Sequence, residues 1–174
     1  MNEKERLNAL EVALNNEMRE REFYLQNAQR TENDVGRAMF QHIADEELEH
    51  YQRLKQLHEA WEKSNKWPIT VPLKVKDTVV KDILNTLLKK TEDTPKGSED
   101  DLDAVRTALE FEARGAKFYA DLCDAVSDQK EKQFFALLSS IENEHYLSLK
   151  DTEEFLVDPV SWYQRKERHH LDGA

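Results

Sequence analysis

The residues of this sequence best suited to chemistry are four glutamates and two histidines, which form one pattern that occurs twice. They are Glu17, Glu47, His50, Glu112, Glu142 and His145. Each of the last three follows its counterpart among the first three by 95 positions. In each copy, a single glutamate precedes a Glu-x-x-His pair. Two single glutamates and two such pairs, each on its own helix, are the ligand set of a carboxylate-bridged two-metal centre.

The spacing within each Glu-x-x-His pair also favours metal binding. Residues three apart lie on the same face of a helix, so both side chains of a pair could reach one ion. Four carboxylates buried in a bundle need neutralising, and two divalent cations supply about four positive charges. The imidazoles would add one neutral nitrogen ligand to each ion. A lone pair of this kind is usually a solvated surface pair, and a duplicated bundle that has lost its metal is the competing interpretation.

The elements that must position these residues are long helices. The 95-residue shift also superposes apolar residues, for example Phe40 on Phe135 and Leu54 on Leu149. Only four glycines and four prolines occur in 174 residues, so long stretches contain no helix breaker. Apolar positions at alternating spacings of three and four predict four helices. They run over about 3–29, from 35 to about 63, from 99 to about 123 and from 128 to about 157.

We therefore expect an all-α fold, a ferritin-like four-helix bundle made of two helical hairpins joined by a long crossover. Hairpin one takes residues 1–63, the crossover residues 64–98, and hairpin two residues 99–157. Within the crossover, an amphipathic pattern over 77–90 predicts a short helix. Residues 158–174, with Pro159 near their start, are predicted to form a C-terminal surface tail.

Composition argues against several classes of partner. The net charge is −11 and no basic stripe interrupts the acidic background, so no nucleic acid partner is expected. No apolar run is long enough to span a bilayer and residues 1–6 lack the apolar core of a secretory signal, so no membrane role is expected. Cys123 is the single cysteine, which excludes an internal disulfide and a cysteine-ligated iron module and agrees with a cytoplasmic location.

The chain resembles a known family, the rubrerythrin-like branch of the ferritin superfamily of diiron carboxylate proteins. The resemblance covers both hairpins, in the strings EMREREFY, IADEELEHY, EFEARGAKFY and IENEHYLSL, and the ending WYQRKERHHLDGA also looks like tails of this branch. It implies two iron ions as cofactors, with the six repeated residues as ligands and Glu47 and Glu142 as the bridging carboxylates. It also implies an oxidoreductase that reduces hydrogen peroxide to water, with iron oxidation as a related activity.

The chain departs from full-length rubrerythrins in two ways. Its single cysteine means that the usual rubredoxin domain is missing, so we expect NADH-linked electrons to arrive from an external donor such as rubredoxin. The extra glutamate that the family has one turn after the single glutamate of its second half is replaced by Gly115. The symmetry-related position is Glu20, which shares a helix face with Glu17. Glu20 could be a catalytic seventh ligand or a solvated glutamate in an acidic run.

Two tyrosines are the remaining catalytic candidates. Tyr24 and Tyr119 lie two turns beyond the single glutamates on the same face, so they could hydrogen-bond a ligand or supply an electron. Buried aromatic packing explains them equally well. Tyr51, Tyr146 and Cys123 are expected to be structural. Four further histidines have no inward-facing glutamate partner and are expected at the surface: His42, His58, His169 and His170.

Several alternatives stay open from the sequence. Instead of a peroxidase, the chain could be a ferroxidase or iron-handling protein that stores or delivers iron, or a helical interaction module stapled by metal. A site of oxygen and nitrogen ligands does not distinguish iron from manganese or zinc. The resemblance also suggests a homodimer, in which a crossover of roughly 35 residues could permit exchange of hairpins between protomers.

Overall fold

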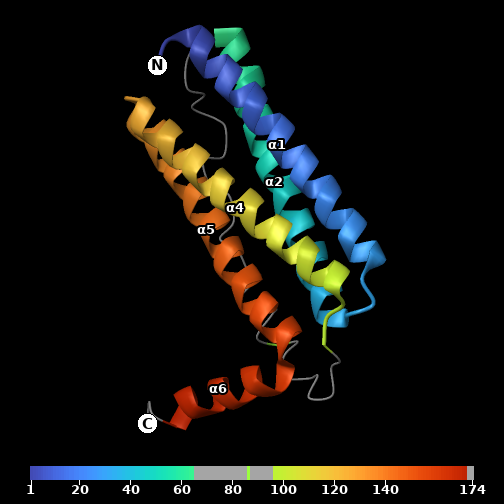
Figure 1. Cartoon of the computed structure of the whole chain (residues 1–174). Helices are drawn as coiled ribbons and strands as arrows, with labels where there is room; N and C mark the ends of the chain where they lie inside the picture. Colours follow the sequence, from blue (N-terminus) through green and yellow to red (C-terminus); the bar gives the residue numbers. More distant parts are fainter. Residues whose placement is uncertain (65–85, 87–95, 172–174) are drawn as a thin grey trace.

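The described part of the chain is entirely helical apart from short connections, as expected for an all-α protein. The structure is a computed structural model and describes residues 1–64, 86 and 96–171. Its helices are α1 (Glu3–Arg30), α2 (Asp34–Ser64), α4 (Glu99–Ala125), α5 (Gln129–Val157) and α6 (Pro159–Leu171) (Figure 1). Of the short helix predicted over 77–90, all but residue 86 lies outside the described residues. The exchange of hairpins through the crossover therefore stays a prediction.

Side-chain caps fix where the bundle helices begin. Asn2 caps α1 and Ser98 caps α4, each in a capping box whose acidic partner, Glu5 or Asp101, bonds back to the backbone of the cap. Asp128 accepts hydrogen bonds from two backbone N–H groups at the start of α5. Asn33 accepts from the backbone N–H groups of residues 35 and 36, which starts α2 directly after α1. Short polar links between consecutive helices therefore produce two antiparallel hairpins.

The two hairpins are joined with the topology that a long crossover requires. Helix α1 runs down the view of Figure 1 and α2 returns upward, but α4 then runs upward again beside α1 before α5 descends. A simple up-and-down bundle would have α4 descending. Helices α1 and α4 are therefore antiparallel across the hairpin boundary, and so are α2 and α5. The expected ferritin-like bundle of two hairpins is confirmed.

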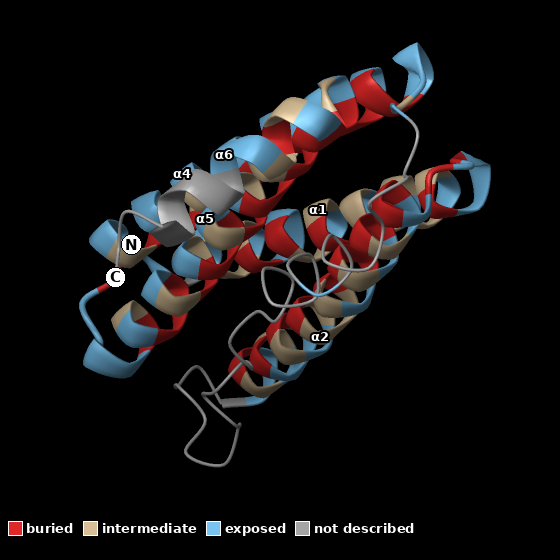
Figure 2. Ribbon diagram, turned by 90° about the horizontal axis from the view of Figure 1, so that it is seen from below, coloured by how far each residue is buried: buried red, intermediate tan, exposed pale blue. Residues whose placement is uncertain are grey.

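The core consists of two apolar clusters at opposite ends of the bundle. One gathers around Tyr24, Phe40 and Phe155, and the other around Leu54 and Phe135. Figure 2 shows buried residues in red along the sides of the helices that face one another, and exposed residues in pale blue on the outer sides. Between the two clusters, the inward positions are occupied by charged side chains. The apolar ends thus hold a polar middle layer in place and separate it from water.

The segment after the bundle forms a helix where the sequence predicts only a surface tail. Pro159 suits the first position of a helix, and Asp158 caps α6 by accepting a hydrogen bond from the Ser161 N–H at 3.1 Å. Trp162 is buried, with its ring edge-on to Phe155 at 5.7 Å between centroids. Helix α6 therefore turns away from the bundle axis, as Figure 1 shows, yet is anchored to the end of α5.

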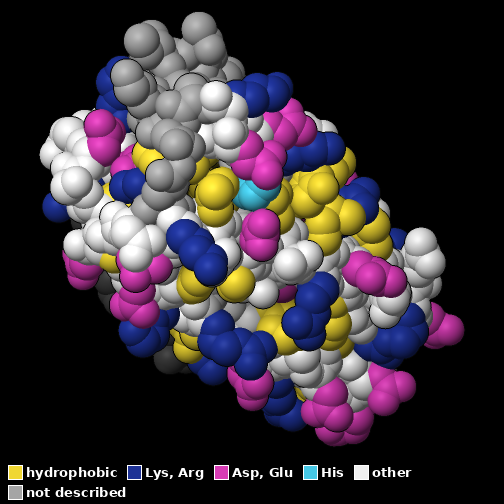
Figure 3. All heavy atoms as spheres, turned by 90° about the horizontal axis from the view of Figure 1, so that it is seen from above, with side chains coloured by type: hydrophobic (Ala, Val, Ile, Leu, Met, Phe, Trp, Pro, Cys, Tyr) yellow, Lys and Arg dark blue, Asp and Glu magenta, His cyan; other side chains and the backbone are white. Residues whose placement is uncertain are grey.

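The surface carries many charged side chains of both signs (Figure 3). In the view of Figure 3, acidic and basic side chains lie next to one another and apolar side chains show between them.

Among the described helices, none combines the length and the apolar character needed to cross a membrane.

Candidate metal centre

The polar layer in the middle of the bundle contains all six repeated residues. Each bundle helix contributes to it: α1 and α4 supply one glutamate each, and α2 and α5 supply one Glu-x-x-His pair each. The members are Glu17, Glu47, His50, Glu112, Glu142 and His145. Their exposed fractions lie between 0% and 2%. Residues 95 positions apart in the sequence thus meet in one buried site.

The six side chains form two overlapping groups of possible ligands. In the first group, one atom from each of Glu17, Glu47, His50 and Glu142 lies within 4.8 Å of the others. The second group keeps the shared glutamates and replaces the other two members by Glu112 and His145. Two neighbouring cation positions that share Glu47 and Glu142 fit this geometry. The shared pair is the one that the family resemblance assigns as bridging.

Both histidine rings direct the same nitrogen toward the carboxylates. His50 Nδ1 lies 3.2 Å from Glu17 Oε2 and 3.3 Å from Glu47 Oε2. His145 Nδ1 lies 3.3 Å from Glu112 Oε2 and 3.4 Å from Glu47 Oε1. The two rings stack with centroids 6.0 Å apart and planes inclined by 18°. Each half of the cluster therefore offers one Nδ1 and a ring of carboxylate oxygens to a common centre.

Several side-chain oxygen and nitrogen atoms in this layer that could bind a metal ion make no hydrogen bond to any described residue. They are Glu47 Oε1 and Oε2, Glu112 Oε2, Glu142 Oε1 and Oε2, and His145 Nδ1. Buried polar atoms are rarely left in this state, since each costs about 1–3 kcal/mol, and more when charged. Carboxylate oxygen and imidazole nitrogen together suit iron, manganese or zinc. The residues present therefore fit a two-cation site.

Burial and mutual repulsion shift the protonation of this layer. Burial, reinforced by the charge of Glu47, raises the pKa of both Glu17 and Glu142 well above the usual range. Burial by itself would lower the pKa of the two histidines and raise that of Glu47. The attraction between the imidazoles and the carboxylates is larger and reverses both shifts. The pKa of His50 is raised by Glu47 and Glu17, that of His145 is raised by Glu112, and that of Glu47 is lowered, chiefly by His50. Without metal, the cluster therefore holds protons that cations must displace.

The two tyrosines connect the hairpins by hydrogen bonds to the single glutamates. The Tyr24 hydroxyl donates to Glu112 Oε1, and the Tyr119 hydroxyl donates to Glu17 Oε1. Each bond crosses between α1 and α4, because these helices are antiparallel. Burial raises the pKa of both phenols, so they remain neutral donors. The structure thus shows that these tyrosines hydrogen-bond the candidate ligands Glu112 and Glu17, and the electron-supplying role stays a prediction.

Replacing either tyrosine by phenylalanine should weaken metal binding on one side of the cluster. Y119F removes the hydrogen bond that orients Glu17, and Y24F removes the one that orients Glu112. We expect each variant to lose about 10-fold in affinity for one of two Co²⁺ ions, at the low end of the effect of outer hydrogen-bond partners. Calorimetric titration measures this, with Y146F as the control. If both variants lost affinity for both Co²⁺ ions equally, the assignment of each tyrosine to one side of the cluster would be wrong.

Glu20 lies beside the cluster and outside both ligand groups. Burial, and then the charges of Glu47, Glu142, Glu112 and Glu17, raise the pKa of its carboxyl to about 10. It lines a cavity of about 390 Å³ between α1 and α4. The complete lining is Asn16, Arg19, Glu20, Phe111, Arg114, Gly115 and Phe118. Its surroundings therefore agree with neither a bound ligand nor a fully solvated glutamate in this structure.

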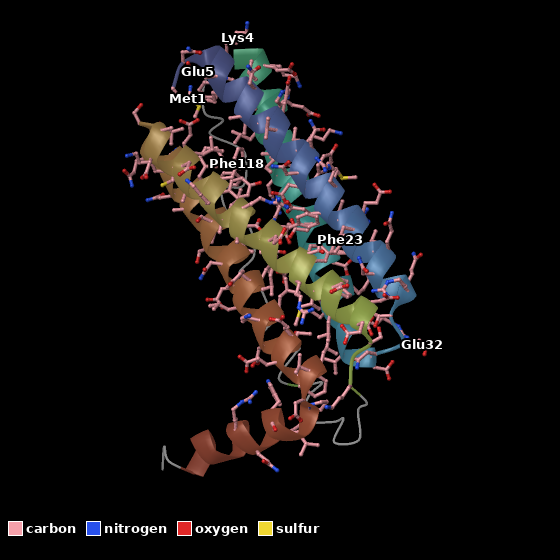
Figure 4. The ribbon with its side chains drawn as sticks, in the orientation of Figure 1. Met1, Lys4, Glu5, Phe23, Glu32 and Phe118 are labelled. Carbon is pink, nitrogen blue, oxygen red and sulfur yellow. The ribbon has the colours of Figure 1, made fainter. Side chains whose placement is uncertain are left out.

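Gly115 forms the part of this cavity that adjoins the ligand cluster. A Cβ atom added there would lie 3.3 Å from Glu142 Oε2, so the absence of a side chain lets this buried carboxylate approach the α4 backbone closely. Phe23 and Phe118, which occupy equivalent positions in the two halves, lie along the same α1–α4 side of the bundle (Figure 4). The cavity is asymmetric, with a glutamate on one wall and a glycine on the symmetry-related wall.

Glu46 is a site residue that the sequence repeat does not reveal. Its Oε2 lies 2.7 Å from His145 Nε2, the ring nitrogen that faces away from the carboxylate cluster. The position 95 residues later is Ile141, so comparison of the two halves conceals it. Its place directly before Glu47, on the same helix as one Glu-x-x-His pair, is the only hint that the sequence offers.

The other candidates lie outside the cluster. His58 is half-buried, 3.7 Å from Glu11 and from Glu62, and His42 is half-buried at a separate position on α2. Cys123 lies 3.4 Å from the carbonyl oxygen of Lys132 and is half-buried. Tyr51 and Tyr146 are also half-buried, away from the ligand groups. The side chains of His169 and His170 lie outside the described residues.

Comparison with known proteins agrees with this geometry. A family model described as rubrerythrin matches residues 8–153, a range that contains all six residues of the two ligand groups and most of both hairpins. No curated protein and no solved structure matches the chain. The matched range covers most of the 174 residues and ends before α6. The chain belongs to the rubrerythrin family.

Proposed function

We propose that this chain is a non-haem diiron peroxidase that reduces hydrogen peroxide to water with electrons from an external donor such as rubredoxin. The single observation that carries the proposal is the pair of buried ligand groups that share Glu47 and Glu142, with donor atoms left unbonded. Membership of the rubrerythrin family favours iron over other cations. The cavity between α1 and α4 supports the proposal further, because a small molecule in it would lie beside Gly115, which adjoins the Glu142 carboxylate.

In this proposal, the position of each residue determines its role. Two bound ferrous ions would supply the two electrons that convert hydrogen peroxide and two protons into two water molecules. Glu47 and Glu142 would hold both ions, and the single glutamates and the histidines would complete one side each. Tyr24 and Tyr119 keep the single glutamates oriented by hydrogen bonds. The apolar clusters at both ends keep water out of the layer.

In this proposal, Glu20 delivers a proton to peroxide in the cavity. With its pKa raised to about 10, its carboxyl is protonated at neutral pH, so it can act as a general acid. Arg19 and Arg114 line the same cavity and would attract a developing negative charge on the leaving oxygen. Once deprotonated, Glu20 could move toward an ion as a seventh ligand, which unites its two proposed roles.

The E20Q variant should bind two metal ions but react slowly with peroxide. We expect the rate of oxidation to fall by about 100-fold, the lower limit for loss of a general acid, with metal content unchanged. Stopped-flow absorbance after mixing with peroxide measures the rate. E22Q is the matched control, since Glu22 is exposed on the same helix and the charge change is the same. Wild-type rates in E20Q would refute the general-acid role.

The experiment that tests the proposed function compares two oxidants. The full chain is loaded with Fe²⁺ without oxygen and mixed rapidly with either hydrogen peroxide or oxygen. Oxidation that is much faster with peroxide, followed by repeated turnover when NADH, a rubredoxin reductase and rubredoxin are added, supports the peroxidase. Oxidation by oxygen alone, with indifference to peroxide, overturns it in favour of a ferroxidase. Redox-inert zinc in protein from iron-replete cells, with unchanged peroxide tolerance after loss of Glu112, favours a structural role.

A further inference from the structure

The two halves of the candidate centre differ in what lies behind their histidines. His145 presents Nδ1 to the carboxylates, and its Nε2 lies 2.7 Å from Glu46 Oε2. A carboxylate accepts hydrogen bonds, so Nε2–H is the donor and Nδ1 is left unprotonated in the neutral ring. Glu46 is on α2 and His145 is on α5, so the contact crosses between hairpins. The Glu46 side chain is 20% exposed, which keeps its charge partly solvated.

His50 has no equivalent carboxylate from α5. In the antiparallel pair of α2 and α5, the position that corresponds to Glu46 is Ile141, a buried side chain of the apolar cluster. Two other features of the centre are the same in both halves. Each tyrosine reaches one single glutamate, and Glu47 and Glu142 belong to both ligand groups. The contact from Glu46 is therefore a difference between the two metal positions that is separate from the difference between Glu20 and Gly115 at the cavity.

We infer that Glu46 is a positioning residue that makes the metal position at Glu112 and His145 the tighter of the two and the first to fill. The hydrogen bond selects the tautomer in which Nδ1 is a ligand, restrains the ring, and increases electron donation by the imidazole. Removing such a partner typically weakens metal binding by about 10- to 100-fold. The inference rests on the proposed two-metal centre and adds an order of loading to it.

Titration of the metal-free full chain with Co²⁺ tests this order. Wild-type protein should bind two ions in separate steps, with affinities about 10- to 100-fold apart. In E46L the tighter step should weaken by the same factor and merge with the second, which stays unchanged. E46Q should lose less than 10-fold, because its amide oxygen can still accept the Nε2–H bond. D45N is the matched control, since Asp45 is exposed on the same helix and the charge change equals that of E46Q.

Proton spectra of the Co²⁺-loaded protein provide a readout apart from affinity. The exchangeable Nε2–H resonance of His145 should be protected from solvent in the wild type, shifted in E46Q and lost in E46L. If E46L does not fold, the shift in E46Q decides. An unchanged resonance in E46Q, equal weakening of both steps in E46L, or the same loss in D45N overturns the inference while two ions still bind. A wild-type chain that binds no pair of ions overturns the proposed function instead.

Discussion

Replacing Glu47 by glutamine is expected to leave the chain folded but unable to hold two metal ions. Glu47 belongs to both ligand groups, and its two oxygens lie near different histidines: Oε2 is 3.3 Å from His50 Nδ1 and Oε1 is 3.4 Å from His145 Nδ1. A glutamine keeps one oxygen and turns the other into an N–H donor, which repels a cation. It also removes one negative charge from a layer whose charge must balance two ions.

The expected loss of metal binding and of activity in E47Q exceeds the loss expected from substitution of any residue that would contact only one ion. Metal content should fall from two ions to one or none. Peroxide-driven oxidation should fall by more than about 100-fold, the upper range for loss of a side chain that hydrogen-bonds a metal ligand. Iron analysis together with stopped-flow mixing measures both quantities. E49Q is the control, because Glu49 lies on the same helix two positions away and pairs with Arg53 instead. Two ions bound to E47Q with wild-type affinity would contradict a bridging role for Glu47.

The six-residue cluster is predictable from the sequence because three regularities agree. The i, i+3 spacing places Glu47 and His50 on one helix face, the repeat supplies an identical second copy, and apolar residues mark the inward side of every helix. The long crossover then requires α2 and α4 to run in the same direction. Local rules combined with one internal duplication are therefore sufficient for the bundle and for which side chains meet at its centre.

Contacts between the two hairpins are less predictable from the sequence, because they depend on the axial register of one hairpin relative to the other. Tyr24 is two turns from Glu17 in its own helix, but its hydroxyl bonds to Glu112 of α4. The role of Glu46 is also not predicted. Its counterpart 95 positions later, Ile141, carries no charge, and comparison of the two halves identifies only residues that are alike in both. Helix α6 depends on the burial of Trp162 against α5, which periodicity within a short segment does not disclose.

The metal-free chain is expected to lose thermal stability as the pH rises from 6 to 9, whereas the metal-loaded chain should not. Burial raises the pKa of Glu17 and Glu142, burial and neighbouring carboxylates raise that of Glu20 to about 10, and carboxylates raise those of both histidines. In the unfolded chain, glutamates release their protons near pH 4.3 and histidines near pH 6.5. Over this interval the folded, metal-free chain therefore holds more protons than the unfolded chain.

The sign of the effect follows from this difference in bound protons. When the folded state binds more protons, the free energy of unfolding falls with rising pH, by about 1.4 kcal/mol per pH unit for each extra proton. The lowered pKa of Glu47 works in the opposite direction, but its contribution is complete once unfolded glutamate is ionised, below pH 6. One extra proton retained over three pH units lowers the melting temperature by on the order of 10 °C in a chain of this size.

Differential scanning calorimetry at pH 6, 7.5 and 9, with and without Fe²⁺ under anaerobic conditions, measures this slope. In the loaded chain the cations replace the protons, so the melting temperature should stay nearly constant over the same range. E20Q separates the contributions, because it removes the titration of Glu20 and leaves the six-residue cluster intact, so the metal-free slope should become smaller. A metal-free melting temperature independent of pH would mean that the buried glutamates are already ionised at pH 6. The cluster would then hold its charge without cations, and the main physical reason for assigning a metal centre to it would be lost.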